Sequence, residues 1–81
     1  MAEIHLWGAL RPAADGQSSV TIEAVTIREL LRKLEEQYPR MAPLLDTGIA
    51  VSIDGVIFQD NWGKEIPTGA EVYLLPRIEG G

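Results

Sequence analysis

Two segments near the start of the chain alternate between apolar and polar residues, as a strand with one buried face does. The apolar positions are Ile4, Leu6 and Leu10 in the first segment and Val20, Ile22 and Ala24 in the second. Arg11 and Pro12 end the first segment, and the Asp15–Gly16 pair between the two is typical of hairpin turns. The pattern predicts two neighbouring strands joined by a hairpin connection.

The pattern then changes to the period of a helix. Thr26 and Glu29 stand at the spacing of a capping box, in which the side chain of each residue binds a backbone N–H of the other. The apolar stripe that follows consists of Ile27, Leu30, Leu31, Leu34 and Tyr38. Pro39 ends the helix near Gln37 or Tyr38. Because strands flank this helix, we expect the stripe to cover a sheet of the same chain and not a partner helix.

A second pair of strands is predicted in the middle of the chain. Its first strand alternates apolar and small residues, with Ile49, Val51 and Ile53 as the apolar set. Asp54 and Gly55 then form a two-residue hairpin turn, which sets Ile53 opposite Val56. Phe58 has the parity of Val56, so both are predicted to lie on the buried face.

The remaining segments connect or close this pattern. Residues 40–48 are predicted to be irregular, with at most one short turn. Residues 59–70 read as a long polar connection in which Trp62 and Ile66 are the apolar anchors. The last strand spans residues 71–76 and ends on a proline, which has no N–H to donate.

The predicted order of elements is β-β-α-β-β-β, with one amphipathic helix to cover one face of the sheet. The simplest unknotted arrangement places the last strand beside the first and parallel to it, through a right-handed crossover. The expected fold is therefore α+β, a β-grasp with a mixed sheet. We expect residues 1–81 to form a single domain with a flexible tail from about residue 77.

Composition narrows the classes of function. The 81 residues include no cysteine and a single histidine, His5, so disulfides and metal sites are not expected. Twelve acidic and seven basic residues give a net charge of −5, which disfavours nucleic acid and permits a basic protein partner. No apolar run approaches the roughly 20 residues of a membrane span, and the first residues lack the features of a signal peptide. We expect a cytoplasmic protein that binds neither membrane nor nucleic acid.

The side chains do not predict an enzyme. One histidine makes a catalytic triad improbable, and no glycine-rich segment has the spacing and the lysine of a phosphate loop. The aspartates at positions 46, 54 and 60 do not match a calcium loop. Glu35 and Glu36 point in different directions on the predicted helix and are expected to be solvated.

A few large side chains fall on the parity that faces away from the helix. Tyr73 and Leu75 do so in the last strand, and because the helix covers one face only, they are left over on the other. Either a partner contacts them or the connection with Trp62 covers them. Trp7 is expected to pack under an edge loop or to belong to a binding surface. Its neighbour His5 is expected to be an ordinary exposed strand residue or a surface contact.

The chain ends on Gly80 and Gly81, after the last strand has stopped. Residues 77–81 could extend roughly 15 Å at about 3.3 Å per residue. Glycines without a Cβ can enter a narrow tunnel and present the terminal carboxylate at its end. That carboxylate is ionised at neutral pH and is a nucleophile toward the α-phosphate of ATP. The chain has no ATP site of its own, so a partner would have to supply one.

The ordered set of segments resembles the MoaD/ThiS sulfur-carrier proteins, which are ubiquitin-like β-grasp domains that end in Gly-Gly. The similarity covers about residues 2–81. The segments that carry it are LWGALR (6–11), TIRELLRKLEEQYP (26–39), VSIDGVIF (51–58) and GAEVYLLPRIEGG (69–81). The first of them is most similar to molybdopterin synthase small subunits, since thiamine-type carriers usually lack it.

The resemblance implies a protein co-substrate that binds no cofactor itself. An E1-like enzyme, using ATP and Mg²⁺, would adenylate Gly81, and a persulfide-bearing sulfur donor protein would convert it to a thiocarboxylate. In the molybdenum cofactor branch the tail would enter a molybdopterin synthase large subunit and give sulfur to the pterin precursor. The residues that would thread are Arg77, Ile78, Glu79 and Gly80. The residues implied at the partner interface are Leu75, Tyr73, Pro76 and Trp7.

Two positions depart from the family pattern. Arg77 replaces the usual second proline, and Glu79 replaces the small residue before the glycines. These departures leave the recipient of the sulfur open. The alternatives are a thiamine-pathway or other sulfur carrier, a ubiquitin-like modifier joined to lysines through Gly81, and an interaction module whose tail has no role.

Overall fold

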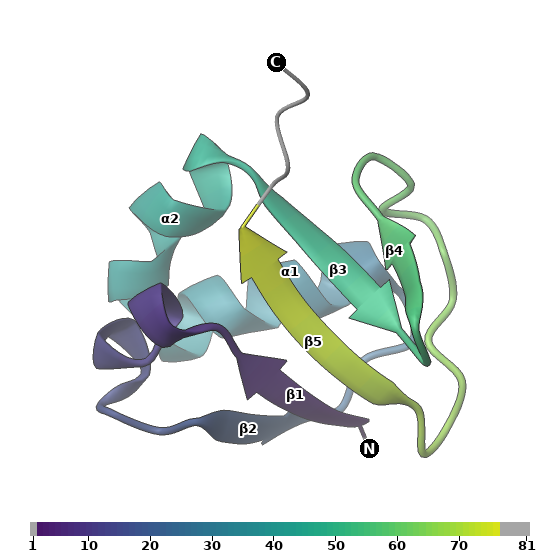
Figure 1. Ribbon diagram of the computed structural model, residues 1–81, viewed down its shortest axis with the longest axis horizontal. Coiled ribbons are helices and arrows are strands. Elements are labelled where there is room, and N and C mark those ends of the chain that lie inside the picture. The colour runs from purple at the N-terminus through teal and green to yellow at the C-terminus, as the bar shows by residue number, and fades with distance from the viewer. Residues whose placement is uncertain (1, 77–81) are drawn as a thin grey trace.

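The computed structural model describes residues 2–76, and its strands form one mixed sheet in the order β2-β1-β5-β3-β4 (Figure 1). The strands are β1 (Ala2–Leu6), β2 (Ser19–Ile22), β3 (Ile49–Ile53), β4 (Val56–Phe58) and β5 (Glu71–Pro76). β5 lies in the middle, parallel to β1 and antiparallel to β3. The predicted β-grasp, with the last strand beside the first, is confirmed.

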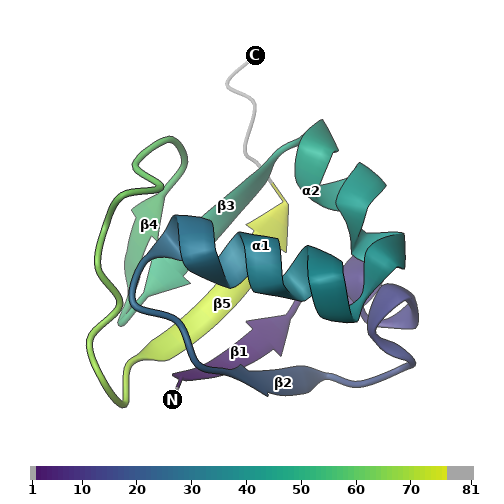
Figure 2. The same cartoon turned by 180° about the vertical axis from the view of Figure 1, so that it is seen from behind.

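Helix α1 (Ile27–Gln37) covers one face of the sheet (Figure 2). Its start follows the predicted capping box: Thr26 Oγ1 accepts a hydrogen bond from the Glu29 N–H at 3.2 Å. Glu29 reaches back by one residue more than predicted, because its Oε1 accepts from the Val25 N–H at 2.9 Å. The stripe is confirmed as the core face, since Ile27, Leu30 and Leu34 are fully buried. They pack against the inward residues of the strands, which include Ile4, Leu6, Val51, Val72 and Leu74.

The first strand is shorter than predicted. β1 stops at Leu6, and the chain continues through short 3-10 helices over Gly8–Leu10 and Pro12–Ala14. Leu10 is buried as expected, but from a 3-10 turn and not from a strand. Asp15 and Gly16 adopt positive φ of 57° and 83°, yet they end the second turn and do not form a hairpin loop. β1 and β2 nevertheless pair antiparallel.

Residues 40–48 hold more structure than predicted. A 3-10 turn over Pro39–Met41 leads into helix α2 (Ala42–Thr47). Met41 is fully buried, and Leu44 and Leu45 pack partly buried against the core. The segment therefore forms a second, short helix beside α1 (Figure 2).

The second hairpin has the predicted register, with Ile53 opposite Val56. Asp54 and Gly55 have positive φ of 49° and 89°, as a two-residue hairpin turn of this kind requires. The burial prediction is wrong for Val56, which is 56% exposed because β4 is an edge strand and has a neighbouring strand on one side only. Phe58 is partly buried against the core.

Candidate functional site

The face of the sheet opposite α1 is open (Figures 1 and 2). On β5, Val72 and Leu74 are fully buried, so the alternate residues Tyr73 and Leu75 project from the open face. Tyr73 is 39% exposed and Leu75 is half-buried. The structure thus brings these two predicted interface residues together on one surface.

The two tryptophans lie on different sides of the molecule. Trp62 packs partly buried against the core, and its carbonyl oxygen accepts a hydrogen bond from the Arg28 N–H of α1 at 2.8 Å. The alternative in which its connection covers Tyr73 and Leu75 is therefore wrong. Trp7 directly follows β1, its N–H donates to the Leu74 carbonyl at 3.2 Å, and its side chain is 47% exposed. Trp7 lies beside the end of β5, where residues 77–81 begin.

Ile57 of β4 adds an apolar side chain that the sequence interpretation missed. Ser52 pairs with Tyr73 on one side and with Ile57 on the other, so two large side chains flank a small one. Ile57 is 47% exposed, whereas Ser52 is 8% exposed. The parity of Ile57 in the sequence, which is opposite to that of Phe58, could have predicted that Ile57 lies on the open face. Together Trp7, Ile57, Tyr73 and Leu75 form what we call the apolar patch.

An ordered polar cluster adjoins the patch. The rings of His5 and Tyr73 stack with centroids 4.5 Å apart and planes 19° from parallel. Glu3 Oε1 lies 3.1 Å from His5 Nε2, and the Tyr73 hydroxyl donates to Glu71 Oε1 at 2.6 Å. That hydrogen bond, then desolvation and the charges of Glu71 and Glu3, raise the pKa of the Tyr73 phenol. His5 is half-buried and stacked, so it is not the ordinary exposed strand residue expected.

The open face has two different ends. A depression of about 400 Å³ is lined at one end by Glu3, His5, Glu71 and the turn at Gly69 and Ala70. The apolar patch occupies the other end, toward the last residues of β5. A partner that covers the face would therefore meet carboxylates at one end and apolar side chains at the other.

Strand β5 leads directly into the tail. Pro76 pairs with Ile49 of β3 at the end of the sheet. The predicted tail residues Arg77, Ile78, Glu79, Gly80 and Gly81 lie outside the described residues, as does the side chain of Pro76. The described residues therefore define the surface that adjoins the start of the tail.

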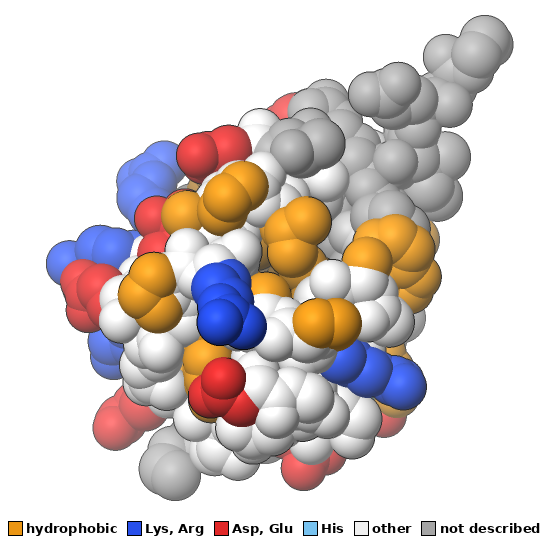
Figure 3. Space-filling view, turned by 90° about the vertical axis from the view of Figure 1, so that its left-hand side faces the viewer, with side chains coloured by type: hydrophobic (Ala, Val, Ile, Leu, Met, Phe, Trp, Pro, Cys, Tyr) orange, Lys and Arg blue, Asp and Glu red, His pale blue; other side chains and the backbone are white. Residues whose placement is uncertain are grey.

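Other kinds of site find little support in residues 2–76. In that range no three histidine or carboxylate side chains gather closely enough to hold a metal ion. None of the helices described has the length and apolarity that a membrane crossing needs. At the end of the molecule formed by α2 and the 3-10 turns, Figure 3 shows hydrophobic side chains in small groups separated by charged ones.

A mixed five-stranded sheet, with the last strand central and a helix across one face, defines a ubiquitin-like β-grasp protein. The model of the ThiS family matches residues 4–81. The chain belongs to the ThiS family. No curated protein sequence matches it significantly.

The chain superposes on solved structures from bacteria and from an archaeon. CysO of Mycobacterium tuberculosis, described as an antigen, superposes with a TM-score of 0.83 at 20% identity, over 96% of this chain and 100% of that one. SAMP1 of Haloferax volcanii superposes with a TM-score of 0.78 at 23% identity, over 99% of this chain and 98% of that one. One chain in the complex of subunits 1 and 2 of the molybdopterin-converting factor of Helicobacter pylori superposes with a TM-score of 0.70 at 22% identity, over 99% of this chain and 97% of that one. At these identities the likeness shows the fold.

Proposed function

We propose that this protein is a sulfur carrier whose Gly81 carboxylate is activated by an E1-like enzyme and converted to a thiocarboxylate. The observation that supports it most directly is that the apolar patch and the tail share strand β5. Tyr73 and Leu75 project from the open face, and Pro76 is the last residue of the same strand. A partner that docks on the patch therefore holds the point from which Gly81 is presented.

The proposed chemistry balances in three steps. A carboxylate oxygen of Gly81 attacks the α-phosphorus of ATP. Pyrophosphate is released, and the product is an acyl-adenylate. The terminal sulfur of a persulfide on the sulfur donor protein attacks the acyl carbon. AMP is released, and the product is an acyl disulfide between the two proteins. A second thiolate of the donor attacks the donor's own sulfur in that bond. The donor is left with a disulfide and Gly81 with a thiocarboxylate. ATP and Mg²⁺ belong to the activating partner, and we expect the reaction in the cytoplasm.

We propose the molybdenum cofactor pathway as the destination of the sulfur, with a molybdopterin synthase large subunit as the acceptor. The segment LWGALR supports this choice over a thiamine-pathway carrier. A fold shared with a subunit of the molybdopterin-converting factor of Helicobacter pylori is compatible with it. In the segment LWGALR, strand β1 ends at Leu6, so Trp7 lies outside the strand and can contribute to the apolar patch.

The second candidate is a protein modifier that is conjugated to lysines through Gly81. The fold shared with SAMP1 of Methanosarcina acetivorans, whose structure is described as that of a small archaeal modifier protein, is compatible with it. Both functions begin with the same adenylate. They differ in the nucleophile that next attacks the acyl carbon, a persulfide sulfur in one and a lysine amine in the other.

Mass spectrometry of the protein isolated from its own cells separates the two. A C-terminal peptide in which sulfur replaces one oxygen supports the carrier. Gly-Gly remnants on lysines of other proteins, left by a protease that cleaves after Glu79, support the modifier. Deletion of Gly81 abolishes ATP–pyrophosphate exchange by the activating enzyme under either proposal, while a Gly63→Ala control retains it. If the Gly81 deletion leaves that exchange and cell function intact, both proposals are wrong.

A further inference from the structure

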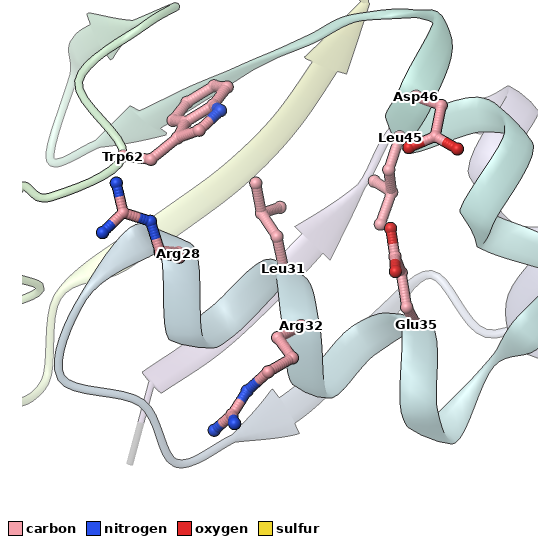
Figure 4. Close-up of a pocket in the computed structure, with 7 residues that line it drawn as sticks. All are labelled: Arg28, Leu31, Arg32, Glu35, Leu45, Asp46 and Trp62. Atoms are coloured by element: carbon pink, nitrogen blue, oxygen red, sulfur yellow. The ribbon is translucent and has the colours of Figure 1, made fainter.

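A groove of about 300 Å³ lies on the helix side of the molecule, away from the apolar patch (Figure 4). Helix α1 forms one wall, α2 another, and the connection between β4 and β5 a third. The groove is lined by Arg28, Leu31, Arg32 and Glu35 of α1, Leu45 and Asp46 of α2, and Trp62 of the connection.

The charges along the groove are ordered. Figure 4 shows Arg28 next to Trp62 at one end, Leu31 in the middle, and Leu45 together with Glu35 and Asp46 at the α2 end, while the side chain of Arg32 points away from the groove. Within residues 2–76, Arg28, Glu35 and Asp46 form no ion pair with one another or with any other side chain. The groove therefore has a basic end, an apolar middle and an acidic end, and its charges are available to a ligand.

The tail begins close to the acidic end. Pro76 pairs with Ile49, and only Gly48 separates Ile49 from α2. The five residues 77–81 could span roughly 15 Å at about 3.3 Å each. Along α1, the distance from Glu35 to Arg28 is roughly 10 Å at about 1.5 Å per residue. The extended tail and the stretch of α1 between Glu35 and Arg28 are therefore of comparable length.

The order of residues in the tail is complementary to the groove. Arg77 comes first and would meet Asp46 and Glu35. Ile78 follows and would lie over Leu31 and Leu45. An acidic group comes last, as Glu79 and the terminal carboxylate, and would meet Arg28. Arg77 and Glu79 are the two positions that depart from the family pattern, so the same two departures create the match.

We propose that residues 77–81 dock in this groove of the same chain and hold Gly81 on the helix side until a partner displaces them. Exposed ion pairs contribute little free energy each, so the docked tail exchanges rapidly with a released one. The docking stands on the groove alone, whereas its role in delaying activation rests on the proposed function.

Nuclear magnetic resonance of the full chain, without ATP or any partner, tests the docking. The amide signals of Gly80 and Gly81 are compared in the wild type, Arg28→Glu, Arg40→Glu and the double variant Arg28→Glu/Glu79→Arg. We expect Arg28→Glu to shift both signals and lower their heteronuclear NOE, and the double variant to restore them. The control Arg40→Glu, at an exposed site, should leave them unchanged.

The docking is wrong if Arg28→Glu and Arg40→Glu give the same Gly80 and Gly81 signals. Unchanged amide signals from β5 show that each variant is folded. Because no activating enzyme is present, this failure would leave the proposed function standing. Equally, a lack of adenylation would leave the docking result standing.

Cysteine pairing distinguishes the chain's own tail from that of a second copy. The sequence has no cysteine, so Leu31→Cys/Ile78→Cys introduces a single pair. A disulfide requires Cα atoms about 4.4–6.8 Å apart. We expect an oxidised monomer, and no disulfide in the control Arg40→Cys/Ile78→Cys. A disulfide-linked dimer, or no disulfide, would overturn the proposal.

Discussion

The rings of His5 and Tyr73 stack with centroids 4.5 Å apart across the parallel pair of strands β1 and β5. The hydroxyl of Tyr73 is held by Glu71, and Glu3 lies against the imidazole of His5. A large exposed side chain is thereby fixed in one orientation before any partner arrives. Fixing it in advance reduces the entropy that association must otherwise lose.

His5→Ala removes the stack and should lower the free energy of unfolding by about 0.5–1.5 kcal/mol, the usual contribution of an aromatic pair. Urea denaturation measures the change. Glu3→Gln is the matched control, because it keeps both rings and removes only the charge beside His5. Equal losses in the two variants would show that the stack does not stabilise the fold.

Stability should fall in alkaline solution because of Tyr73. Its pKa is raised above 10 by the hydrogen bond to Glu71, so the folded state prefers the neutral phenol more than the unfolded state does. The contribution of neutral Tyr73 to the free energy of unfolding is therefore complete below pH 10, and it is lost as the pH rises through the pKa of Tyr73 in the folded state. The absorbance of tyrosinate in a Tyr38→Phe background follows the titration, and Tyr73→Phe should remove this component of the pH dependence.

Ile57→Arg should impair activation while leaving the fold intact. Ile57 is 47% exposed on the open face, and the loss of an interface contact that contributes about 1 kcal/mol lowers the affinity roughly fivefold. ATP–pyrophosphate exchange with the activating enzyme measures it. The control is Val56→Arg, because Val56 directly precedes Ile57 and is also exposed on β4, but has the opposite parity. Equal effects of the two variants would exclude the apolar patch as the docking surface.

Thr26→Ala should destabilise the protein by about 1 kcal/mol, because the Glu29 N–H at the start of α1 loses its acceptor. Thermal unfolding gives the change. Thr68→Ala, in an exposed turn, should have little effect. A midpoint for Thr26→Ala that matches the Thr68→Ala midpoint would contradict a capping role for this hydroxyl.

The sequence predicted the sheet and α1 well, because both depend on periods that extend over many residues. Leu10 shows the limit: a buried residue at the right parity fits a strand and a 3-10 turn equally. α2 has six residues, too few to display a helical period, and Pro43 within it resembles a loop signal. Val56 has the parity of the core residues but lies on β4, at an edge of the sheet. The alternation of apolar and polar residues does not show which strands lie at the edges.

The candidate site was predicted only in part for a similar reason. Alternation assigns Tyr73 and Leu75 to the open face, whatever their neighbours are. The stack of His5 on Tyr73 depends on the register of a parallel pair far apart in sequence, which no local pattern contains. The parity of Ile57 could have assigned it to the open face, but its place in the same row as Tyr73 depends on the pairing of both residues with Ser52.

The central position of β5 has a mechanical consequence. The strand is hydrogen-bonded to β1 on one side and to β3 on the other. A partner that pulls on the tail therefore loads two ladders of hydrogen bonds along their length, and cannot peel the strand away as it could from an edge. A partner that binds the tail, as proposed above, would therefore act on a strand that the sheet holds on both sides.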